Sequence, residues 1–379
     1  MRILLVIDSF FTGGAEFSTL ELFAFLKEKQ VDIKICKLKE KKPEYDSDSF
    51  DIDQNIITTL PNGSFLIKRK ALQKIISEFK PDVIHSVLFK SNLLVRSIRF
   101  FNSSFVHLES LVNHSYSENR LNEVGVTKMK LLFFRILDCV SSFFGTDHFH
   151  PNGNSVAQHY HEKLGISFKR MTVVYRGRKA SNYENAPAVL KLNFGIEEKT
   201  LVLINVARQE YQKGQDVLIN AMSMLPKDVL EKVHLLIVGR EGKSTLILQE
   251  QVLNNELNSK ITFLGHRTDI PSLLKMADVF VFPSRFEGLP GVLIEAEASG
   301  LPIVCTNLSM MLEVVEINKN ALTFTLDNSS ELADAICELV SSKEMRDSFS
   351  EISKKLFKEK FEIESVHQKM YELYIKIIK

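Results

Sequence analysis

Short apolar runs alternate with helix-like segments along almost the whole 379-residue chain. The runs have the length of buried strands, and apolar residues recur at helical spacing in the segments between them. This alternation is typical of parallel sheets, because a helical crossover must join each strand to the next. The expected strands are 2–7, 31–38, 82–87, 104–108, 147–150 and 171–175 in the first half, and 201–206, 234–238, 261–264, 279–282, 302–305 and 321–326 in the second.

The alternation restarts near residue 196, after a polar stretch with little periodicity at 178–187. A chain of this length suits two α/β domains better than one. We therefore predict two doubly wound, Rossmann-like domains that face a central cleft. The expected boundaries are 1–180 for an N-terminal domain, 181–195 for a linker and 196–360 for a C-terminal domain. Residues 361–379 are expected to form a helix that packs back on the N-terminal domain.

Composition is that of an ordinary soluble globular protein, with 45% apolar and 25% charged residues. A net charge of +1 gives no reason to expect a nucleic-acid partner. The four cysteines have no metal-binding spacing and suit a reducing compartment. The first apolar run is interpreted as a strand and not as a signal peptide, and no apolar stretch is long enough to span a membrane. A cytoplasmic protein without a cofactor is expected.

The strongest chemical signal is the segment PSRFEGLPGVLIEA at 283–296. It follows an apolar strand and opens into a helix near Gly291. Free amides at a helix start attract anions and hydroxyl oxygens, and glycine allows a close approach to the backbone. Glu287 lies where the strand ends, and Glu295 lies about one turn into the helix. The alternative is a plain turn followed by a solvated helix residue.

A second signal is the segment LINVARQEYQKGQD at 203–216, in which Arg208 and Lys213 follow a strand end. An arginine fork and a lysine point charge together suit a diphosphate. Taken alone, Arg208 is equally well explained as a surface charge. A third, weaker signal is FTGGAE at 11–16, where Gly13 and Gly14 separate the first strand from the first helix and would allow an anion to approach. A tight turn explains these glycines equally well.

Together these segments resemble the retaining glycosyltransferases of the GT-B fold, specifically the large family 4, also called glycosyl transferases group 1. The resemblance extends over nearly the whole chain and is densest at 201–313. It implies that Glu287 contacts the transferred sugar, that Glu295 contacts the ribose, and that Arg208 and Lys213 hold the diphosphate. The donor site that it implies comprises Gly13, Gly14, Arg208, Lys213, Gly239, His266, Arg267, Glu287, Gly288, Leu289, Pro290, Gly291 and Glu295.

The same resemblance implies an active-site residue in the N-terminal domain, near 106–109. His107 is the expected catalytic residue, although a looser alignment places Glu109 there. Glu109 and His114 are expected to contact the acceptor, and His85 is a further candidate at the end of a strand. No metal is expected, because the Asp51-Ile52-Asp53 triplet is interpreted as part of a loop.

The segment 127–144 has a broad apolar helical face formed by Met129, Leu132, Phe133, Ile136, Val140 and Phe143. Leu131 and Phe134 fall outside this face, among basic residues. Two interpretations remain open: a membrane-facing helix, or a domain helix whose outlying residues pack under a loop.

We therefore predict a retaining, metal-independent glycosyltransferase of the hexosyltransferase type. It would use a nucleotide sugar, preferably a UDP-sugar, and a glycan or lipid-linked acceptor in surface polysaccharide or glycoconjugate biosynthesis. Peripheral contact with the inner face of the cytoplasmic membrane is part of this hypothesis. The alternatives are a nucleotide-sugar epimerase or phosphorylase of the same fold, and a non-enzymatic protein that binds sugar nucleotides.

Overall fold

The computed structural model describes residues 1–10, 14–39, 56–122 and 125–379. The chain forms two compact units. Unit 1 comprises Met1–Tyr116, Val126–Arg176 and Glu364–Lys379, and unit 2 comprises Ser117–Gly125 and Gly177–Ile363. Unit 2 therefore includes residues 181–195, the expected linker.

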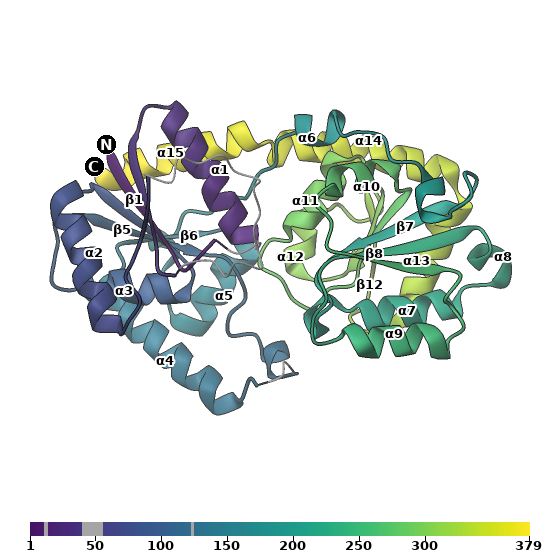
Figure 1. The fold of residues 1–379 in the computed structure, drawn as a ribbon, viewed down its shortest axis with the longest axis horizontal. Coiled ribbons are helices and arrows are strands. Elements are labelled where there is room, and N and C mark those ends of the chain that lie inside the picture. The colour runs from purple at the N-terminus through teal and green to yellow at the C-terminus, as the bar shows by residue number, and fades with distance from the viewer. Residues whose placement is uncertain (11–13, 40–55, 123–124) are drawn as a thin grey trace. The chain divides into compact units, whose positions relative to one another are not determined.

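Unit 1 is built on a parallel sheet of six strands in the order β3-β2-β1-β4-β5-β6. Figure 1 labels β1, β5 and β6 of this sheet. Its centre is apolar on both faces, and every residue from Ile3 to Ile7 in β1 is fully buried. Such continuous apolar runs are typical of parallel strands covered on both sides. The strands are β1 (Arg2–Ile7), β2 (Asp32–Lys37), β3 (Ile57–Thr59), β4 (Val83–Val87), β5 (Val106–Leu111) and β6 (His148–Pro151).

Helices cover both faces of this sheet. One core cluster joins the sheet to α1 (Gly14–Glu28) and α15 (Ile363–Ile378), and another joins it to α2 (Phe65–Phe79) and α3 (Phe89–Arg99). In α15, Val366, Met370, Leu373 and Tyr374 are buried. The remaining helices are α4 (Lys128–Gly145) and α5 (Asn154–Leu164).

Unit 2 contains a second parallel sheet of six strands, in the order β12-β11-β10-β7-β8-β9. The strands are β7 (Leu201–Val206), β8 (Val233–Val238), β9 (Ile261–Gly265), β10 (Val279–Phe282), β11 (Ile303–Thr306) and β12 (Ala321–Phe324). Helices α7 (Gln215–Met224), α8 (Lys227–Leu230), α9 (Thr245–Asn254) and α13 (Ser329–Ser341) contribute to its main core. The other helices are α6 (Ser181–Glu184), α10 (Ile270–Met276), α11 (Gly291–Ala298), α12 (Ser309–Leu312) and α14 (Lys343–Lys360).

The two sheets share one topology, because numbering the strands from the start of each unit gives the order 3-2-1-4-5-6 in both. This is the order of the doubly wound Rossmann fold, and the predicted fold class is therefore confirmed. Two details differ from the expected strands. β3 was not predicted, and 171–175 forms only an isolated bridge at Met171. The latter segment lies beside β6 at the edge of the sheet and forms no regular ladder.

The sequence left the orientation of helix α4 open, and the structure shows which side packs on the rest of unit 1. The predicted apolar face of α4 is exposed, whereas Leu131, which was expected outside that face, packs in a core cluster with α5 and β6. The residues that α4 buries are Asp138, Ser142 and Gly145. Among the residues that the structure describes, no helix is long and apolar enough to cross a membrane.

Unit 1 buries several histidines that remain neutral. Burial lowers the pKa of His107 and of His159 to about 3, and that of His150 and of His367 to about 4. Burial also lowers the pKa of His85 well below its usual value. In unit 2, burial instead raises the pKa of Glu297 well above its usual value. Unit 1 also contains Asp138, whose pKa burial raises, and the described part of unit 2 contains a single such histidine, His234, whose pKa burial lowers. Acidification should therefore destabilise unit 1 more than unit 2.

We predict that unit 1 loses stability as the pH falls below about 6.5, the pKa of an unperturbed histidine. The histidines are then protonated in the unfolded chain but still neutral in the folded one. The free energy of unfolding therefore falls until the pH approaches about 4. Hydrogen exchange with mass spectrometry, corrected for intrinsic rates, should show lower protection of β4 and β5 at pH about 5 than at about 7.5. Peptides from β7 and β10, which contain no histidine, are the internal control, and an equal loss in both units would contradict the prediction.

Candidate functional site

The candidate site lies where the strand order of unit 2 reverses, between β7 and β10. At such a point the two following crossovers run to opposite faces of the sheet, which leaves a crevice at the carboxyl ends of the strands. The loop 207–214 follows β7, and the loop 283–290 follows β10. Both predicted segments with the strongest chemical signals therefore meet at one edge of one sheet.

Hydrogen bonds fasten these two loops together. The Arg285 amide donates to the carbonyl of Gln212 at 2.8 Å, and the Gln212 side chain donates back to the carbonyl of Phe286 at 2.6 Å. Gly214 adopts a φ of 63°, and a side chain there would collide with the carbonyl oxygen of Pro283. Only glycine permits this approach without strain. The spacing between the loops is therefore set by backbone contacts.

The fastened loops bring Lys213 and Glu287 into an ion pair. The Lys213 Nζ lies 2.5 Å from Glu287 Oε1, and the side chains are 15% and 13% exposed. Ser284 Oγ donates to the same carboxylate oxygen at 2.8 Å. The Glu287 carboxylate is thus held at the end of β10, beside a cation from the neighbouring loop. Such a pair presents an acceptor for hydroxyl groups next to a positive charge.

Arg285 ties the site to the rest of unit 2. Its buried guanidinium donates two hydrogen bonds to Asp216, at 2.9 and 2.7 Å, and one to Asp327, at 2.7 Å. It also donates to the carbonyl of Tyr211 at 2.6 Å and lies over the ring of that residue. Asp216 lies in the first turn of α7, so one side chain joins both loops to a helix. Arg285 was not predicted as a site residue.

Arg208 and Lys243 line a cavity of about 400 Å³ next to this pair of loops. Both side chains are exposed. Lys243 was not predicted, although it lies in the loop after β8 as Lys213 lies in the loop after β7. The other lining residues are Asn122, Glu210, Tyr211, Gln212, Ser244 and Ile247.

Glu295 lies in α11 and pairs with Arg178. The Arg178 Nε donates to Glu295 Oε1 at 2.9 Å, and the arginine side chain is 6% exposed. Arg178 is held by the backbone, since its amide donates to the Phe361 carbonyl at 2.9 Å and its carbonyl accepts from Ile363. The sequence placed Arg178 in a polar stretch before the linker and missed it as a site residue.

The other predicted donor residues of unit 2 lie in the same strand-end region or beside it. Gly239 directly follows β8 with a φ of 147°, and a side chain there would collide with the carbonyl of Ala207. His266 is exposed, whereas Arg267 makes a two-pronged pair with Asp269 at 2.9 and 2.6 Å. The chain continues from the pair of loops through the buried residues Gly288, Leu289 and Pro290 to Gly291, where α11 begins.

In unit 1, Gly14 begins α1, and a side chain there would crowd the guanidinium of Arg176. Gly13 lies outside the described residues, as does the Asp51-Ile52-Asp53 triplet. His114 is buried and stacks on His159, with ring centroids 4.7 Å apart.

His107 and Glu109 lie on β5 and are fully engaged in the interior of unit 1. His107 Nδ1 is 2.6 Å from the Gly145 carbonyl, and Nε2 is 2.7 Å from Ser86 Oγ. A carbonyl can only accept, so Nδ1 carries the proton. Glu109 is 1% exposed and pairs with Arg96. His85 is also buried, 2.6 Å from the Tyr374 hydroxyl. These positions give all three residues structural contacts.

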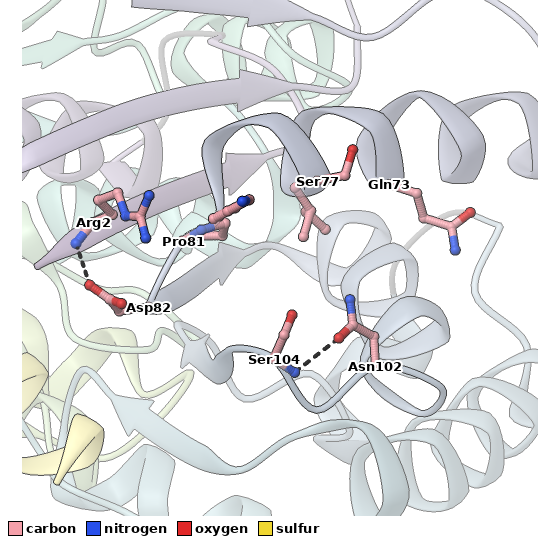
Figure 2. A pocket seen from close by; sticks show the side chains of 9 residues that line it. Arg2, Gln73, Ser77, Pro81, Asp82, Asn102 and Ser104 are labelled. Carbon is pink, nitrogen blue, oxygen red and sulfur yellow. Dashed lines mark hydrogen bonds between the residues drawn. The ribbon is translucent and has the colours of Figure 1, made fainter.

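A larger hollow of about 640 Å³ lies in unit 1, at the amino ends of its strands (Figure 2). It adjoins Arg2, which begins β1, and Asp82, which precedes β4. The Arg2 amide donates to the Asp82 carboxylate at 2.7 Å, as Figure 2 shows. Ligands of doubly wound sheets bind at the carboxyl ends of strands, and this hollow lies at the amino ends. It is therefore not a candidate for the main site.

Metal ligation is not prominent in the described part of the chain. Across residues 1–10, 14–39, 56–122 and 125–379, no group of three or more His, Cys, Asp or Glu side chains is placed to hold an ion. The positive charges at the pair of loops come from Lys213, Arg208 and Arg285, and Arg285 is paired with Asp216 and Asp327.

Known proteins resemble this chain over almost its whole length. It is 24% identical to the capsular polysaccharide biosynthesis glycosyltransferase CapH of Staphylococcus aureus, over 96% of this chain and 95% of the relative. It is also 24% identical to the UDP-Gal:alpha-D-GlcNAc-diphosphoundecaprenol alpha-1,3-galactosyltransferase of Escherichia coli, over 78% and 77%. Anabaena HepE, solved with UDP and glucose, shares the fold with a TM-score of 0.84 at 19% identity, over 99% of this chain and 100% of HepE.

Two family models match the chain in succession. The model described as "Glycosyl transferase 4-like" matches residues 2–106, and the model described as "Glycosyl transferases group 1" matches residues 190–356. The second match contains Arg208, Lys213, Glu287 and Glu295. The chain therefore belongs to the glycosyl transferases group 1, and it is a glycosyltransferase of the GT-B fold.

Proposed function

We propose that this enzyme transfers a sugar, with retention of anomeric configuration, from a nucleotide diphosphate sugar to a glycan or lipid-linked acceptor. The observation that carries this proposal is the Lys213–Glu287 ion pair at the fastened loops of β7 and β10. The pair combines an acceptor for sugar hydroxyls with a cation for a diphosphate. Both groups are held before any ligand arrives, which lowers the cost of organising them during the reaction.

Each side chain then has a separate task. Lys213 and Arg208 stabilise the negative charge that develops on the diphosphate when the anomeric bond breaks. Glu287 accepts hydrogen bonds from the sugar. Glu295, held by Arg178, accepts from the ribose hydroxyls. The remaining donor contacts are proposed for Gly13, Gly14, Gly239, His266, Arg267, Gly288, Leu289, Pro290 and Gly291.

Because the configuration is retained, the acceptor attacks the face of the sugar from which the diphosphate departs. We propose that a phosphate oxygen of the departing diphosphate takes the proton of the acceptor hydroxyl, so that no protein base is required. His107 is left out of the proposed catalytic set, because both of its ring nitrogens are engaged inside unit 1. Glu109 and His114 are also buried, so they are left out of the proposed acceptor contacts.

Relatives favour a UDP-sugar donor and a lipid-linked acceptor. HepE was solved with UDP and glucose, and the name of the Escherichia coli relative states a UDP-galactose donor and a diphosphoundecaprenol acceptor. The Staphylococcus aureus relative is named for capsular polysaccharide biosynthesis. We therefore propose a role in building a surface polysaccharide or glycoconjugate. The enzyme would work in the cytoplasm, at the inner face of the membrane.

The proposed function is tested with a panel of UDP- and GDP-sugars. A donor should raise the melting temperature by mass action, and transfer from that donor should follow with a lipid-diphosphate sugar acceptor. Glu287→Gln keeps the shape of the side chain but removes the charge that pairs with Lys213, so kcat/KM should fall roughly 10²-fold or more. Normal turnover by this variant at saturating donor would refute the role of Glu287. A product of inverted configuration would refute retention.

Arg285 is predicted to act as a positioning residue. Arg285→Ala removes the side chain that joins the two loops to α7, so the 207–216 segment should lose protection from hydrogen exchange. We expect kcat to fall roughly tenfold, because small displacements of preorganised groups are costly, and the free energy of unfolding to drop by about 1.5–3 kcal/mol. Arg346→Ala, which removes hydrogen bonds to two carbonyls in unit 2 away from the loops, is the matched control. An unchanged kcat with unchanged loop exchange would refute the positioning role.

Catalysis should not require a metal ion, because Lys213 and Arg208 supply positive charge at the diphosphate. Initial rates are therefore expected to survive dialysis against EDTA. The control is the same sample after addition of magnesium or manganese. A large loss on dialysis that either ion restores would contradict the prediction.

A further inference from the structure

Helix α4 presents its apolar side to solvent. Met129 is 83% exposed, Phe133 63% and Phe143 69%, although an aromatic helix face normally packs against a core. The side that packs on the rest of unit 1 includes the buried Asp138 and Ser142, together with the partly buried Leu131. The exposed apolar residues of this helix are Met129, Leu132, Phe133, Phe134, Ile136, Val140, Phe143 and Phe144.

A buried ion network fixes this orientation. The Arg96 guanidinium on α3 pairs with Glu109 on β5 and with Asp138 on α4, each at 2.5 Å, and all three side chains are at most 5% exposed. The Tyr116 hydroxyl donates to the second oxygen of Asp138 at 2.5 Å. Rotating α4 to bury its aromatic side would leave the Arg96 charge buried and only partly paired, which is costly.

The contact between α4 and α3 is equally close at the end of the helix. A side chain in place of Gly145 would collide with the backbone of Arg96. The apolar side of α4 is therefore exposed because of how the helix is anchored.

Neighbouring elements extend the apolar surface. Phe65 and Leu66, in the first turn of α2, are 48% and 66% exposed, and Phe100 and Phe101, after α3, are 56% and 77% exposed. The Phe100 ring lies 5.9 Å from that of Phe144 and 4.7 Å from that of Phe101. These residues and α4 border a hollow of about 640 Å³. We call the exposed apolar side of α4, together with Phe65, Leu66, Phe100 and Phe101, the aromatic surface.

The charges on these elements are mostly positive, and the exposed Glu78 near the end of α2 lies 3.9 Å from Lys74. Segments 65–74, 89–101 and 127–145 contain a single acidic residue, Asp138, which is buried against Arg96. The exposed basic residues on these segments are Lys70, Lys74, Lys90, Lys128, Lys130 and Arg135. A protein partner would ordinarily leave a rim of mixed charge, whereas anionic lipid headgroups attract lysine and arginine while the acyl boundary takes up aromatic and aliphatic side chains.

We infer that the aromatic surface docks on an anionic lipid bilayer, with α4 lying in the plane of the interface. The apolar side would enter the boundary between headgroups and acyl chains, and the flanking cations would contact the headgroups. One consequence of this inference rests on the proposed function: a lipid-linked acceptor would be bound at the same membrane surface. Docking itself needs no turnover, so the two can be tested separately.

The test is sedimentation of the full chain with vesicles of phosphatidylcholine alone and with about a third of phosphatidylglycerol. The wild type should bind the anionic vesicles at least about tenfold more strongly than the neutral ones, and added salt should weaken the binding. Phe133→Ser with Phe143→Ser should reduce binding about tenfold or more. Leu246→Ser with Leu253→Ser is the matched control, because these residues are 74% and 63% exposed on α9 of unit 2. The control should bind as the wild type does.

Further measurements separate docking from the alternatives. Both double variants should keep the wild-type melting temperature and donor-induced shift, and Glu287→Gln should still bind vesicles even if it is inactive. Charge reversal by Lys128→Glu with Lys130→Glu should weaken binding to anionic vesicles, although this variant keeps every aromatic side chain of the surface. Absence of binding to anionic vesicles, or equal binding by Phe133→Ser with Phe143→Ser, would overturn the inference. So would a wild-type dimer that becomes monomeric in this variant, because a second copy would then cover the surface.

Discussion

Parallel pairing of β7 with β10 is the constraint on which the candidate site depends. These strands are neighbours in space but are separated in sequence by β8 and β9, so the loops that follow them diverge to opposite faces of the sheet. The divergence leaves room at the sheet edge. There the Arg285 amide donates to the Gln212 carbonyl, and the Gln212 side chain donates to the Phe286 carbonyl. The positions of Lys213 and Glu287 follow from this pairing. They are brought together because each follows a strand of the same pair.

The same constraint acts in unit 1, between β1 and β4. Asp8, just after β1, accepts hydrogen bonds from the amide and the hydroxyl of Ser91 at 2.8 and 2.7 Å. Ser91 lies in the first turn of α3, so this carboxylate satisfies donors at a helix start, where backbone amides lack partners. In unit 1, the carboxylate that follows the first strand at this reversal is therefore bound to Ser91. In unit 2 the strand-order reversal carries the Lys213–Glu287 pair.

The sequence allowed prediction of those features that depend on local order. Apolar runs and the residues after them were enough to predict both doubly wound sheets, and with them the convergence of 203–216 and 283–296. Arg178 was not predictable, because its partner Glu295 is 117 residues away in the sequence. His107 was assigned from a resemblance, and only the structure shows that its ring faces Gly145. For α4, helical periodicity identified two faces but not which one is buried. That choice depends on Arg96 and Glu109, which lie on other elements.

The docking of α15 has a consequence for how the protein is made. Unit 1 begins with the first strand, yet its core includes Val366 and Tyr374, and the Tyr374 hydroxyl bonds to His85 on β4. During translation, β1 to β6 leave the ribosome long before α15 exists, so one face of their sheet lacks part of its cover. Apart from Ser117–Gly125, unit 2 is a continuous segment, Gly177–Ile363, and all of it has been synthesised before α15 is complete. Synthesis of the chain therefore favours completion of unit 2 first, while the exposed face of unit 1 is a natural substrate for a chaperone.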